Sequence, residues 1–333
     1  TRPQVVVIAA GAIGAVSVGL WRPGLLAFVL FALLNLCFAA LVWFKSAAIL
    51  TGLARKAGRR LARGPRAAAT PPEDGSLPVY TVLVPAFGEA NVIADLIEHL
   101  SALDYPHDRL EVLLLLEEVD TATIEAAMRA GLPAFVRIVV VPDGQPRTKP
   151  KACNVGLDFA RGEFLVIYDA EDRPETDQLR KAVALFRANG PDVVCAQARL
   201  NYHNWDENLL TRLFTLEYTH WFDLMLEGLA ALRLPIPLGG TSNHFRTAAL
   251  RDLGAWDPHN VTEDADLGLR AAAKGYRVLT LDSTTYEEEC CRTWPWLRQR
   301  TRWIKGYMQT ALVHTRHPLR FARAAGPHAS ATL

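Results

Sequence analysis

Two long uncharged stretches open the chain, over residues 5–20 and 25–44. The segment 21–24 between them holds one arginine, a proline and a glycine. A helix of twenty apolar residues crosses the ~30 Å hydrocarbon core of a bilayer, whereas one of sixteen is marginal. We therefore predict a transmembrane helical hairpin over residues 1–45 with a tight turn at 21–24. A cleaved signal peptide followed by one anchor is the alternative, but the first stretch shows neither a strongly basic flank nor a clean cleavage site.

From residue 79 onward, short apolar runs alternate with stretches that carry apolar residues at helical spacing. The runs predict strands over 79–85, 110–116, 136–141, 164–168, 193–198 and 276–281, and the stretches predict helices over 91–103, 121–130, 152–160, 177–188, 267–274 and about 294–314. Strands that are apolar throughout and alternate with helices are typical of an α/β fold with a mostly parallel sheet. Ligands of such folds bind at the carboxyl ends of the strands.

Acidic side chains follow these strands at the points where the strands end. They are Glu89, Glu117, Glu118, Asp143, Asp169, Glu171 and Asp172. Because the carboxyl ends of parallel strands meet at one edge of the sheet, we expect these side chains to share that edge. A merely structural sheet gives no reason for this placement, so the pattern favours a functional site.

The run Asp169-Ala-Glu171-Asp172 places three carboxylates within four residues, directly after a strand. Carboxylates gathered in this way repel one another unless a cation lies between them. Mg²⁺ and Mn²⁺ bind carboxylate and phosphate oxygens, so a divalent ion that carries nucleotide phosphates is the expected partner. Asp169 and Glu171 are the expected ligands, with Asp172 as an auxiliary or substitute ligand. A solvated acidic turn is the structural alternative.

Other polar residues supply parts that transfer from a nucleotide sugar needs. Lys149 and Lys151, beside Asn154, could contact phosphate or sugar, or could be solvated loop lysines. Asp264, at the start of a predicted helix, could remove the proton of an acceptor hydroxyl as a general base. A plain helix-capping role is the alternative for Asp264, because aspartate and threonine both cap helices well.

Two helical stretches in the C-terminal half combine aromatic and polar residues. Gln299 and Arg302 lie three residues apart on one helical face with Trp303 beside them. They could offer a cation to a diphosphate and a ring to a sugar, or could form an amphipathic surface turn. Residues 209–225 carry apolar side chains along one face, which is typical of a core helix. Their aromatic content also allows a helix at a membrane interface.

The chain is nearly neutral overall, but one segment of it is strongly basic. The formal charge is +1 and the pI is near 7.7, so no global basic field indicates nucleic-acid binding. Residues 45–66 carry seven Lys or Arg and no acid, which by the positive-inside rule places the following domain in the cytoplasm. We interpret 46–78 as a basic juxtamembrane segment that ends in a Pro-, Gly- and Ala-rich linker over 64–78. Five cysteines without a CxxC spacing indicate neither a disulfide framework nor a zinc site.

Four motifs occur in the order found in family 2 inverting glycosyltransferases, which the chain resembles. They are Val-Pro85-Ala-Phe87-Gly-Glu89, Asp169-Ala-Glu171-Asp172, Thr262-Glu263-Asp264 and Gln299-x-x-Arg302-Trp303. Over about residues 79–315 the chain is similar to the processive branch, the membrane β-glycan synthases related to cellulose and hyaluronan synthases. The resemblance implies a GT-A fold, a UDP- or GDP-sugar donor, Mg²⁺ or Mn²⁺, and inversion at the anomeric carbon.

Together with the chemistry above, the resemblance implies roles for individual residues. Asp264 is the expected general base. The residues expected to bind the donor nucleotide are Pro85, Phe87, Glu89, Glu117, Glu118, Lys149, Asn154, Asp169, Gln299 and Arg302. Those expected to bind the acceptor are Thr241, Ser242, Asn243, Glu263 and Trp303.

The sequence departs from the family's pattern in three places. The family's Asp-x-Asp is here Asp169-Ala-Glu171, which leaves the metal preference open. The usual Asp-Asp after the second strand is Glu117-Glu118, which leaves open which carboxylate faces the base and ribose. Processive members continue into further membrane helices, whereas residues 316–333 contain no further apolar run. We expect a C-terminal tail truncated before such helices, or a channel that a partner supplies.

The sequence thus predicts a multi-pass enzyme of the cell (inner) membrane with a cytoplasmic GT-A domain over 79–315. It is expected to extend a β-linked glycan acceptor, with UDP-glucose as the expected donor. Transfer of one sugar to a polyprenyl phosphate lipid stays open as an alternative, as does a nucleotide-binding membrane scaffold without turnover. A dinucleotide dehydrogenase is disfavoured because no G-x-G-x-x-G follows the first strand.

Overall fold

An eight-stranded sheet forms the centre of the computed structural model, which describes residues 2–63 and 74–316. The strands are β1 (Tyr80–Ala86), β2 (Leu110–Glu117), β3 (Val136–Val141), β4 (Phe164–Ile167), β5 (Arg173–Pro174), β6 (Val193–Tyr202), β7 (Asn243–Arg246) and β8 (Arg277–Glu287). Their order is β3-β2-β1-β4-β7-β6-β8-β5. β7 runs antiparallel to β4 and β6, and β5 runs antiparallel to β8, while the other neighbours are parallel. The mixed, mostly parallel sheet that the apolar strands predict is confirmed.

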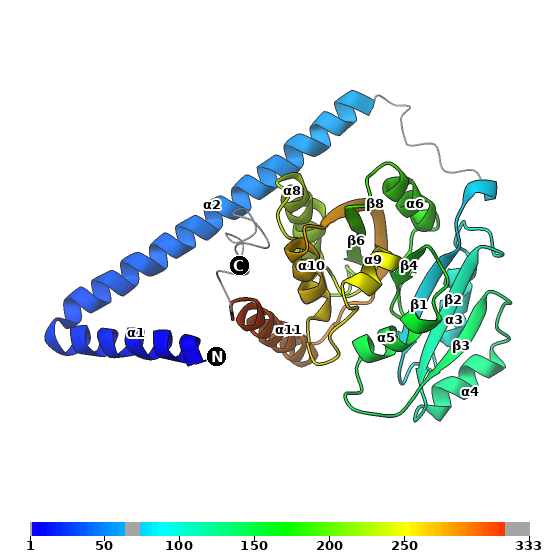
Figure 1. Cartoon of the computed structure of the whole chain (residues 1–333), viewed down its shortest axis with the longest axis horizontal. Helices are drawn as coiled ribbons and strands as arrows, with labels where there is room; N and C mark the ends of the chain where they lie inside the picture. The colour runs from blue at the N-terminus through cyan, green and yellow to red at the C-terminus, as the bar shows by residue number, and fades with distance from the viewer. Residues whose placement is uncertain (1, 64–73, 317–333) are drawn as a thin grey trace.

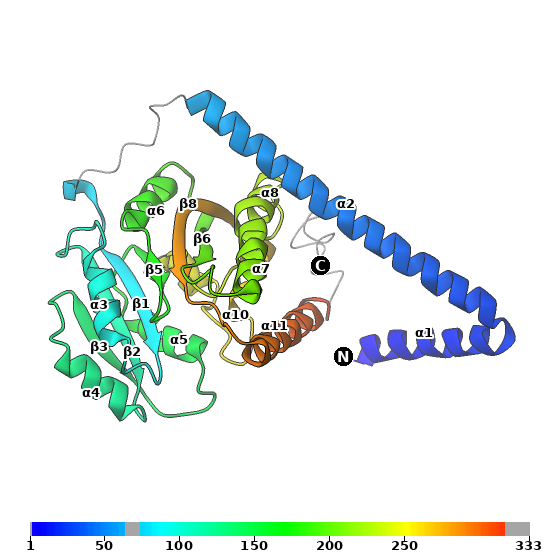
Figure 2. The same ribbon diagram turned by 180° about the vertical axis from the view of Figure 1, so that it is seen from behind.

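Helices cover both faces of this sheet (Figure 1, Figure 2). They are α3 (Ile93–Ser101), α4 (Thr121–Arg129), α5 (Lys149–Phe159), α6 (Gln178–Arg187), α7 (Leu209–Tyr218), α8 (Leu226–Ala231), α9 (Thr247–Asp252), α10 (Glu263–Ala273) and α11 (Thr293–His314), with a 3₁₀ turn η2 (Asp74–Ser76) and a π-helical segment η3 (Thr219–Met225). Side chains of α3, α4 and α6 fill one core, and those of α5, α8, α9 and α10 fill a second. Alternate residues of β2 enter the two cores, so a strand buried on both faces has to be apolar throughout.

Differences from the predicted elements fall in the C-terminal half. β6 and β8 continue beyond their predicted ends at 198 and 281 because they pair with each other through polar residues, up to Tyr202 and Glu287. The helix expected over 209–225 is α-helical only to Tyr218 and then becomes π-helical. Its apolar residues divide: Phe214, Phe222 and Met225 are buried, whereas Leu209, Leu213 and Leu216 are exposed.

Two apolar helices precede the sheet domain, α1 (Arg2–Trp21) and α2 (Pro23–Arg63). They meet at Arg22, and α1 folds back at an acute angle to α2 (Figure 1). The second helix, expected to end at residue 44, continues to Arg63 because residues 46–63 are mostly Ala, Leu, Lys and Arg, which favour helix. Its stretch Pro23–Gly58 is long and apolar enough to cross a membrane, and none of its most apolar window is buried.

The second half of α2 packs against α8 at a crossing of small residues. A Cβ added to Gly228 would lie 1.9 Å from the Ala48 carbonyl oxygen, and one added to Gly52 would lie 2.9 Å from the Gly228 nitrogen. Nearby, Lys56 Nζ donates to the carbonyl oxygen of Asp223 at 2.6 Å. The 41 residues of α2 extend about 60 Å, so one helix can both cross a ~30 Å core and dock on the domain. The linker expected over 64–78 and the tail expected over 316–333 fall largely outside the described residues.

Candidate active site

The carboxyl ends of β1 and β4 bring three acidic side chains together, as predicted. Glu89 follows β1, and Asp169 and Glu171 follow β4. The pKa of Glu89 and that of Glu171 are both raised, mainly by burial and then by the neighbouring Asp169 carboxylate. The edge of the sheet therefore carries concentrated negative charge that favours a cation.

Lys149, the first residue of α5, supplies a cation at this edge. Its Nζ forms an ion pair with Asp169 and donates to the carbonyl oxygen of Gly240 at 2.9 Å. Burial is the largest single influence and disfavours the charged ammonium, yet the surrounding acidic groups, Asp169 first among them, together outweigh that cost and raise the pKa of Lys149. On the other side of this contact, a Cβ on Gly240 would lie 3.7 Å from Oδ2 of Asp264. Contacts through Lys149 and Gly240 thus link Asp169, the predicted donor-side carboxylate, with Asp264, the predicted base.

Asp264 lies in the first turn of α10, beside Glu263. Its Oδ1 accepts the backbone N–H of Ala265 at 2.7 Å, and its Oδ2 is directed toward Gly240. Burial raises the pKa of Asp264 to about 6, and burial followed by the Asp264 carboxylate raises the pKa of Glu263 to about 7. A carboxylate with a pKa this close to neutrality is suited to accept a proton at physiological pH.

Residues 239–242 support this edge of the sheet through side-chain hydrogen bonds. Thr241 Oγ1 lies 3.0 Å from the Ile167 carbonyl oxygen and also reaches Asp172, so two acceptors share its one proton. Ser242 Oγ lies 2.6 Å from Thr285 Oγ1. Ser242 has a φ of 55°, a left-handed conformation that costs a side-chain-bearing residue roughly 1 kcal/mol or more. Thr241, Ser242 and Asn243 are at most 2% exposed, so in this structure they support the site rather than line it.

Asp172 provides a test of whether the edge suits a divalent ion. It is 1% exposed, and its Oδ2 accepts the Asp169 N–H at 2.8 Å and the Thr241 hydroxyl. Its Oδ1 is buried without a hydrogen-bond partner among the described residues, which is costly unless a further ligand or proton satisfies it. Burial, then Asp169, raises the pKa of Asp172 well above its usual range.

Oxygen donors of this kind fit Mg²⁺ or Mn²⁺, and Asp169, Glu171 and Asp172 would hold such an ion. Within residues 2–63 and 74–316 no group of three or more His, Cys, Asp or Glu side chains is already arranged around a metal position. The side-chain chemistry therefore fits the ion, while its coordination sphere is not preformed.

The residues expected to face the nucleotide base follow β2. Glu117 is buried and pairs with Lys151 Nζ at 3.3 Å, whereas Glu118 is exposed and accepts the Asp143 N–H at 3.2 Å. Pro85, near the end of β1, is partly buried, and Phe87, directly after β1, is 60% exposed.

Asn154, a predicted donor-site residue, has both ends of its side-chain amide hydrogen-bonded within the protein. Its amide both donates to and accepts from the backbone of Trp256, at 2.8 and 3.1 Å. These bonds join α5 to the loop before α10.

On α11, Trp303 joins an aromatic cluster. Its ring centroid lies 5.9 Å from that of Phe214, and the Arg300 guanidinium lies 4.1 Å from the Phe214 centroid and 5.1 Å from the Trp303 centroid. Arg302 is exposed, while Gln299 Oε1 is buried without a partner in the described part of the chain. The structure places Arg300 rather than Arg302 within this cluster.

Sequence reasoning missed two side chains that lie near the site. The register of β5 with β8 pairs Arg173 with Tyr286, and one further step places Glu287 opposite Asp172. Burial, then Asp172, raises the pKa of Glu287 well above its usual range. Tyr307 has a pKa raised to about 12 by burial and by the Asp264 carboxylate. No hydrophobic alternation marked Glu287, because residues 282–287 of β8 are polar throughout.

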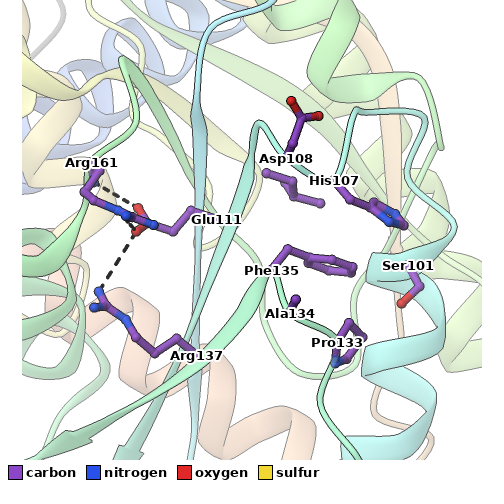
Figure 3. Close-up of a pocket in the computed structure, with 10 residues that line it drawn as sticks. Ser101, His107, Asp108, Glu111, Pro133, Ala134, Phe135, Arg137 and Arg161 are labelled. Carbon is purple, nitrogen blue, oxygen red and sulfur yellow. Dashed lines mark hydrogen bonds and ion pairs between the residues drawn. The ribbon is translucent and has the colours of Figure 1, made fainter.

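The structure also contains a cavity of about 630 Å³ at the amino ends of β2 and β3 (Figure 3). Glu111, Arg137 and Arg161 line it, and Glu111 accepts both the backbone N–H and the Nε of Arg161, at 2.9 and 2.6 Å. His107 and Phe135 pack against each other with centroids 4.5 Å apart. These charged and aromatic groups already have partners, and none of the predicted site residues lies in this cavity.

The mixed sheet, the acidic carboxyl edge and the buried carboxylate opposite it define a GT-A-type, nucleotide-sugar-dependent glycosyltransferase. Residues 78–306 match the family described as "Glycosyltransferase like family 2", and the chain belongs to this family.

The curated relatives that resemble this chain include a mannosyltransferase. The chain is 29% identical over 240 residues to Glucomannan 4-beta-mannosyltransferase 2 of Arabidopsis thaliana, covering 69% of this chain and 45% of the relative. It is 29% identical over 240 residues to Probable glycosyltransferase YdaM of Bacillus subtilis, covering 71% and 57%. The chain therefore spans about half the length of these relatives.

A solved structure shows the same fold. The mannosyltransferase PcManGT from Pyrobaculum calidifontis, in complex with GDP-Man and Mn²⁺, superimposes with a TM-score of 0.59 at 23% identity. The match covers 86% of this chain and 83% of that one.

Proposed function

We propose that this glycosyltransferase moves a hexosyl group from a nucleoside diphosphate sugar to a hydroxyl of a growing β-linked glycan, with inversion at the anomeric carbon. The observation that carries the proposal is the contact series Asp169–Lys149–Gly240–Asp264. It supports the proposal because a carboxylate, a cation and a second, partly buried carboxylate of raised pKa follow one another along these contacts. Inverting transfer needs that combination, because charge develops on the leaving diphosphate while the acceptor loses a proton.

In this proposal each residue has a defined task. Asp169, Glu171 and Asp172 would hold Mg²⁺ or Mn²⁺, which would supply positive charge to neutralise the diphosphate. Lys149 stands beside Asp169 and stabilises negative charge on the leaving phosphate. Asp264 takes the acceptor proton while the acceptor oxygen forms its bond to the anomeric carbon and the bond from that carbon to the phosphate oxygen breaks.

GDP-mannose is the donor we place ahead of the UDP-glucose expected from the sequence. Two curated relatives, from Arabidopsis thaliana and Oryza sativa, are named as 4-β-mannosyltransferases of glucomannan. UDP-glucose and UDP-N-acetylglucosamine are the matched comparisons.

A donor panel with Mn²⁺ or Mg²⁺ tests the function on the full chain in lipid nanodiscs. Release of GDP from GDP-mannose, with β-1,4-linked mannooligosaccharides growing on gels, is the expected result. A single mannose added to polyprenyl phosphate would replace the polymerase by the lipid-loading alternative. Nucleotide binding without release from any donor would leave only the scaffold.

We further propose that α1 and α2 form a hairpin in the membrane with the sheet domain in the cytoplasm. The supporting observations are the exposed apolar length of α2 and the Lys- and Arg-rich residues 45–66, most of which form the C-terminal part of α2. Gly24→Cys, placed in a Cys37→Ser background, should react with an impermeant thiol reagent added outside the cell. A cysteine introduced at Ser76 should not. Labelling of position 76 from outside would overturn the cytoplasmic placement.

A further inference from the structure

The helix that carries Trp303 also lies directly against the segment that begins α10. At Gly306 the side chain of Thr262 packs so closely against α11 that an added Cβ would lie 2.4 Å from Thr262 Cγ2 and 2.7 Å from Thr262 Oγ1. Gly306 is therefore the position where α11 can touch the residue two before Asp264. A larger side chain there would have to push Thr262, and with it the start of α10, away from α11.

One turn further along α11, Thr310 binds the same segment through its hydroxyl. Asn260 Nδ2 donates to Thr310 Oγ1 at 2.9 Å, and Thr262 Oγ1 lies 3.4 Å from it. The other end of the Asn260 amide accepts the Thr262 N–H at 3.1 Å. Thr310 is 2% exposed, so these bonds are sheltered from water and are correspondingly costly to break.

A third contact follows one more turn along. His314 Nε2 lies 2.9 Å from Oδ1 of Asp266, whose Oδ2 accepts Arg270 Nε at 2.7 Å. Asp266 is buried and lies in the first turn of α10. Gly306, Thr310 and His314 are four residues apart and so share one helical face. That face meets the segment from Asn260 to Asp266 at three successive points.

We propose that Gly306, Thr310 and His314 are positioning residues that hold Asp264 at the reacting centre. The inference rests on the proposed function, since Asp264 is the base of that reaction. Thr262, the residue before α10, makes no side-chain bond to its own helix. α11 therefore fixes the start of α10 from outside. Trp303, which is expected to contact the acceptor, lies one turn before Gly306 on α11. The same helix therefore positions both the Trp303 ring and Asp264.

Thr310→Val tests the hydroxyl contacts without changing side-chain shape. In full-length enzyme in nanodiscs, with GDP-mannose, Mn²⁺ and a β-1,4-mannooligosaccharide, kcat should fall about 10- to 100-fold, since small misplacements of a catalytic group are costly. The KM for GDP-mannose and the Kd for GDP with Mn²⁺ should stay within about twofold of the parent. Thr310→Ser should restore most of the rate because it restores the hydroxyl. Gln309→Ala, on the exposed side of the same helix, is the control that should keep parental kcat.

Gly306→Ala tests the close approach by a different route. It should lower kcat at least as far as Thr310→Val, because the new methyl group collides with Thr262. Thr262→Ala removes Cγ2 and Oγ1, the two atoms nearest the added methyl group. The Gly306→Ala/Thr262→Ala double variant should therefore have a higher kcat than the two single effects, multiplied together, would give.

The results separate this inference from the function beneath it. An active parent with Thr310→Val at parental kcat, or with no compensation in the Gly306→Ala/Thr262→Ala pair, overturns the positioning role alone. A loss of GDP binding that parallels the loss of kcat would also overturn it, because the effect would then be structural. A parent that transfers no sugar overturns the proposed function and this inference with it.

Discussion

The half of the sheet that we propose binds the donor comprises β1 to β4, and the half that we propose binds the acceptor comprises β6 to β8 with α7, α10 and α11. These two halves, called the donor half and the acceptor half below, are built on different principles. In the donor half, parallel strands buried on both faces end together, and short loops then present Glu89, Asp169 and Glu171. In the acceptor half, an antiparallel strand, a π-helical segment and a left-handed Ser242 interrupt regular structure. The first half positions its groups by backbone topology, whereas the second positions them by side-chain bonds.

This contrast matters because the two kinds of positioning respond differently to change. Buried polar side chains hold the acceptor half together: Gln178 Nε2 donates to Ser283 and Thr285, each at 3.1 Å, and Thr285 meets Ser242. Such a network is stabilising only when every member has a partner. Single substitutions should therefore displace groups in the acceptor half, whereas in the donor half they should remove charge and leave the geometry intact.

The largest expected effect is on the chemical step. Asp264→Asn keeps the shape of the side chain and an oxygen to accept the Ala265 N–H, but it cannot take a proton. Transfer should fall by about 10²–10⁴-fold, the typical contribution of a positioned general base. Sugar incorporation, measured beside calorimetric GDP binding with Mn²⁺, checks this. Glu263→Gln is the neighbouring control and should do less damage. Transfer near the parental rate would remove Asp264 from the mechanism.

On the donor side, Asp169→Ala removes a proposed metal ligand and the ion-pair partner of Lys149. Because the affected group binds the ion, metal-dependent GDP affinity should fall at least tenfold, with the fold unchanged. Titration of GDP with and without Mn²⁺ measures the difference, and Asp158→Asn on the exposed side of α5 is the control. An Asp169→Ala protein whose GDP affinity still depends on Mn²⁺ as in the parent would place the ion elsewhere.

The positions of candidate site residues were predictable from the sequence where these residues lie at the end of an element. Asp169 follows an apolar strand and Asp264 begins a helix, and both places are visible in the hydrophobic pattern. The family and the GT-A-type fold were predictable for the same reason, since the motifs fall on strand ends and helix starts.

It was less successful where a polar sequence is buried. Thr241, Ser242 and Asn243 were expected to bind an acceptor. They lie directly before and at the start of β7, which pairs with β4 and β6 inside the sheet, and their side chains are buried there. Hydropathy cannot distinguish a polar residue in water from one whose partners come from distant strands. Glu287 was missed for the same reason, because the polar end of β8 did not resemble a strand.

The pH dependence of transfer is the next largest effect. Burial raises the pKa of Asp264 to about 6, and only the ionised carboxylate can accept a proton. The rate should therefore fall about tenfold per unit below pH 6 and level off above it. Measurements of kcat between pH 5 and 8, with GDP binding followed in parallel, test this. An acid limb centred near pH 4, the range of an unperturbed aspartate, would show that Asp264 is not buried in the working enzyme.

The smallest expected effect is on stability. Asp264→Asn should raise the free energy of unfolding at neutral pH, although it lowers activity. Because the folded-state pKa of about 6 lies above the ordinary value of 3.8, the folded protein binds this proton more tightly than the unfolded chain does. The stability that protonation contributes is fully present below pH 3.8 and is lost as pH rises through 6. At pH 8 Asp264→Asn should therefore raise the free energy of unfolding, by on the order of 2 kcal/mol, and the melting temperature by several degrees. At pH 5 the gain should shrink, because the parent is then largely protonated. Thermal melts of both proteins in nanodiscs at the two pH values make the comparison, and an equal difference at pH 5 and pH 8 would contradict a buried, charged Asp264.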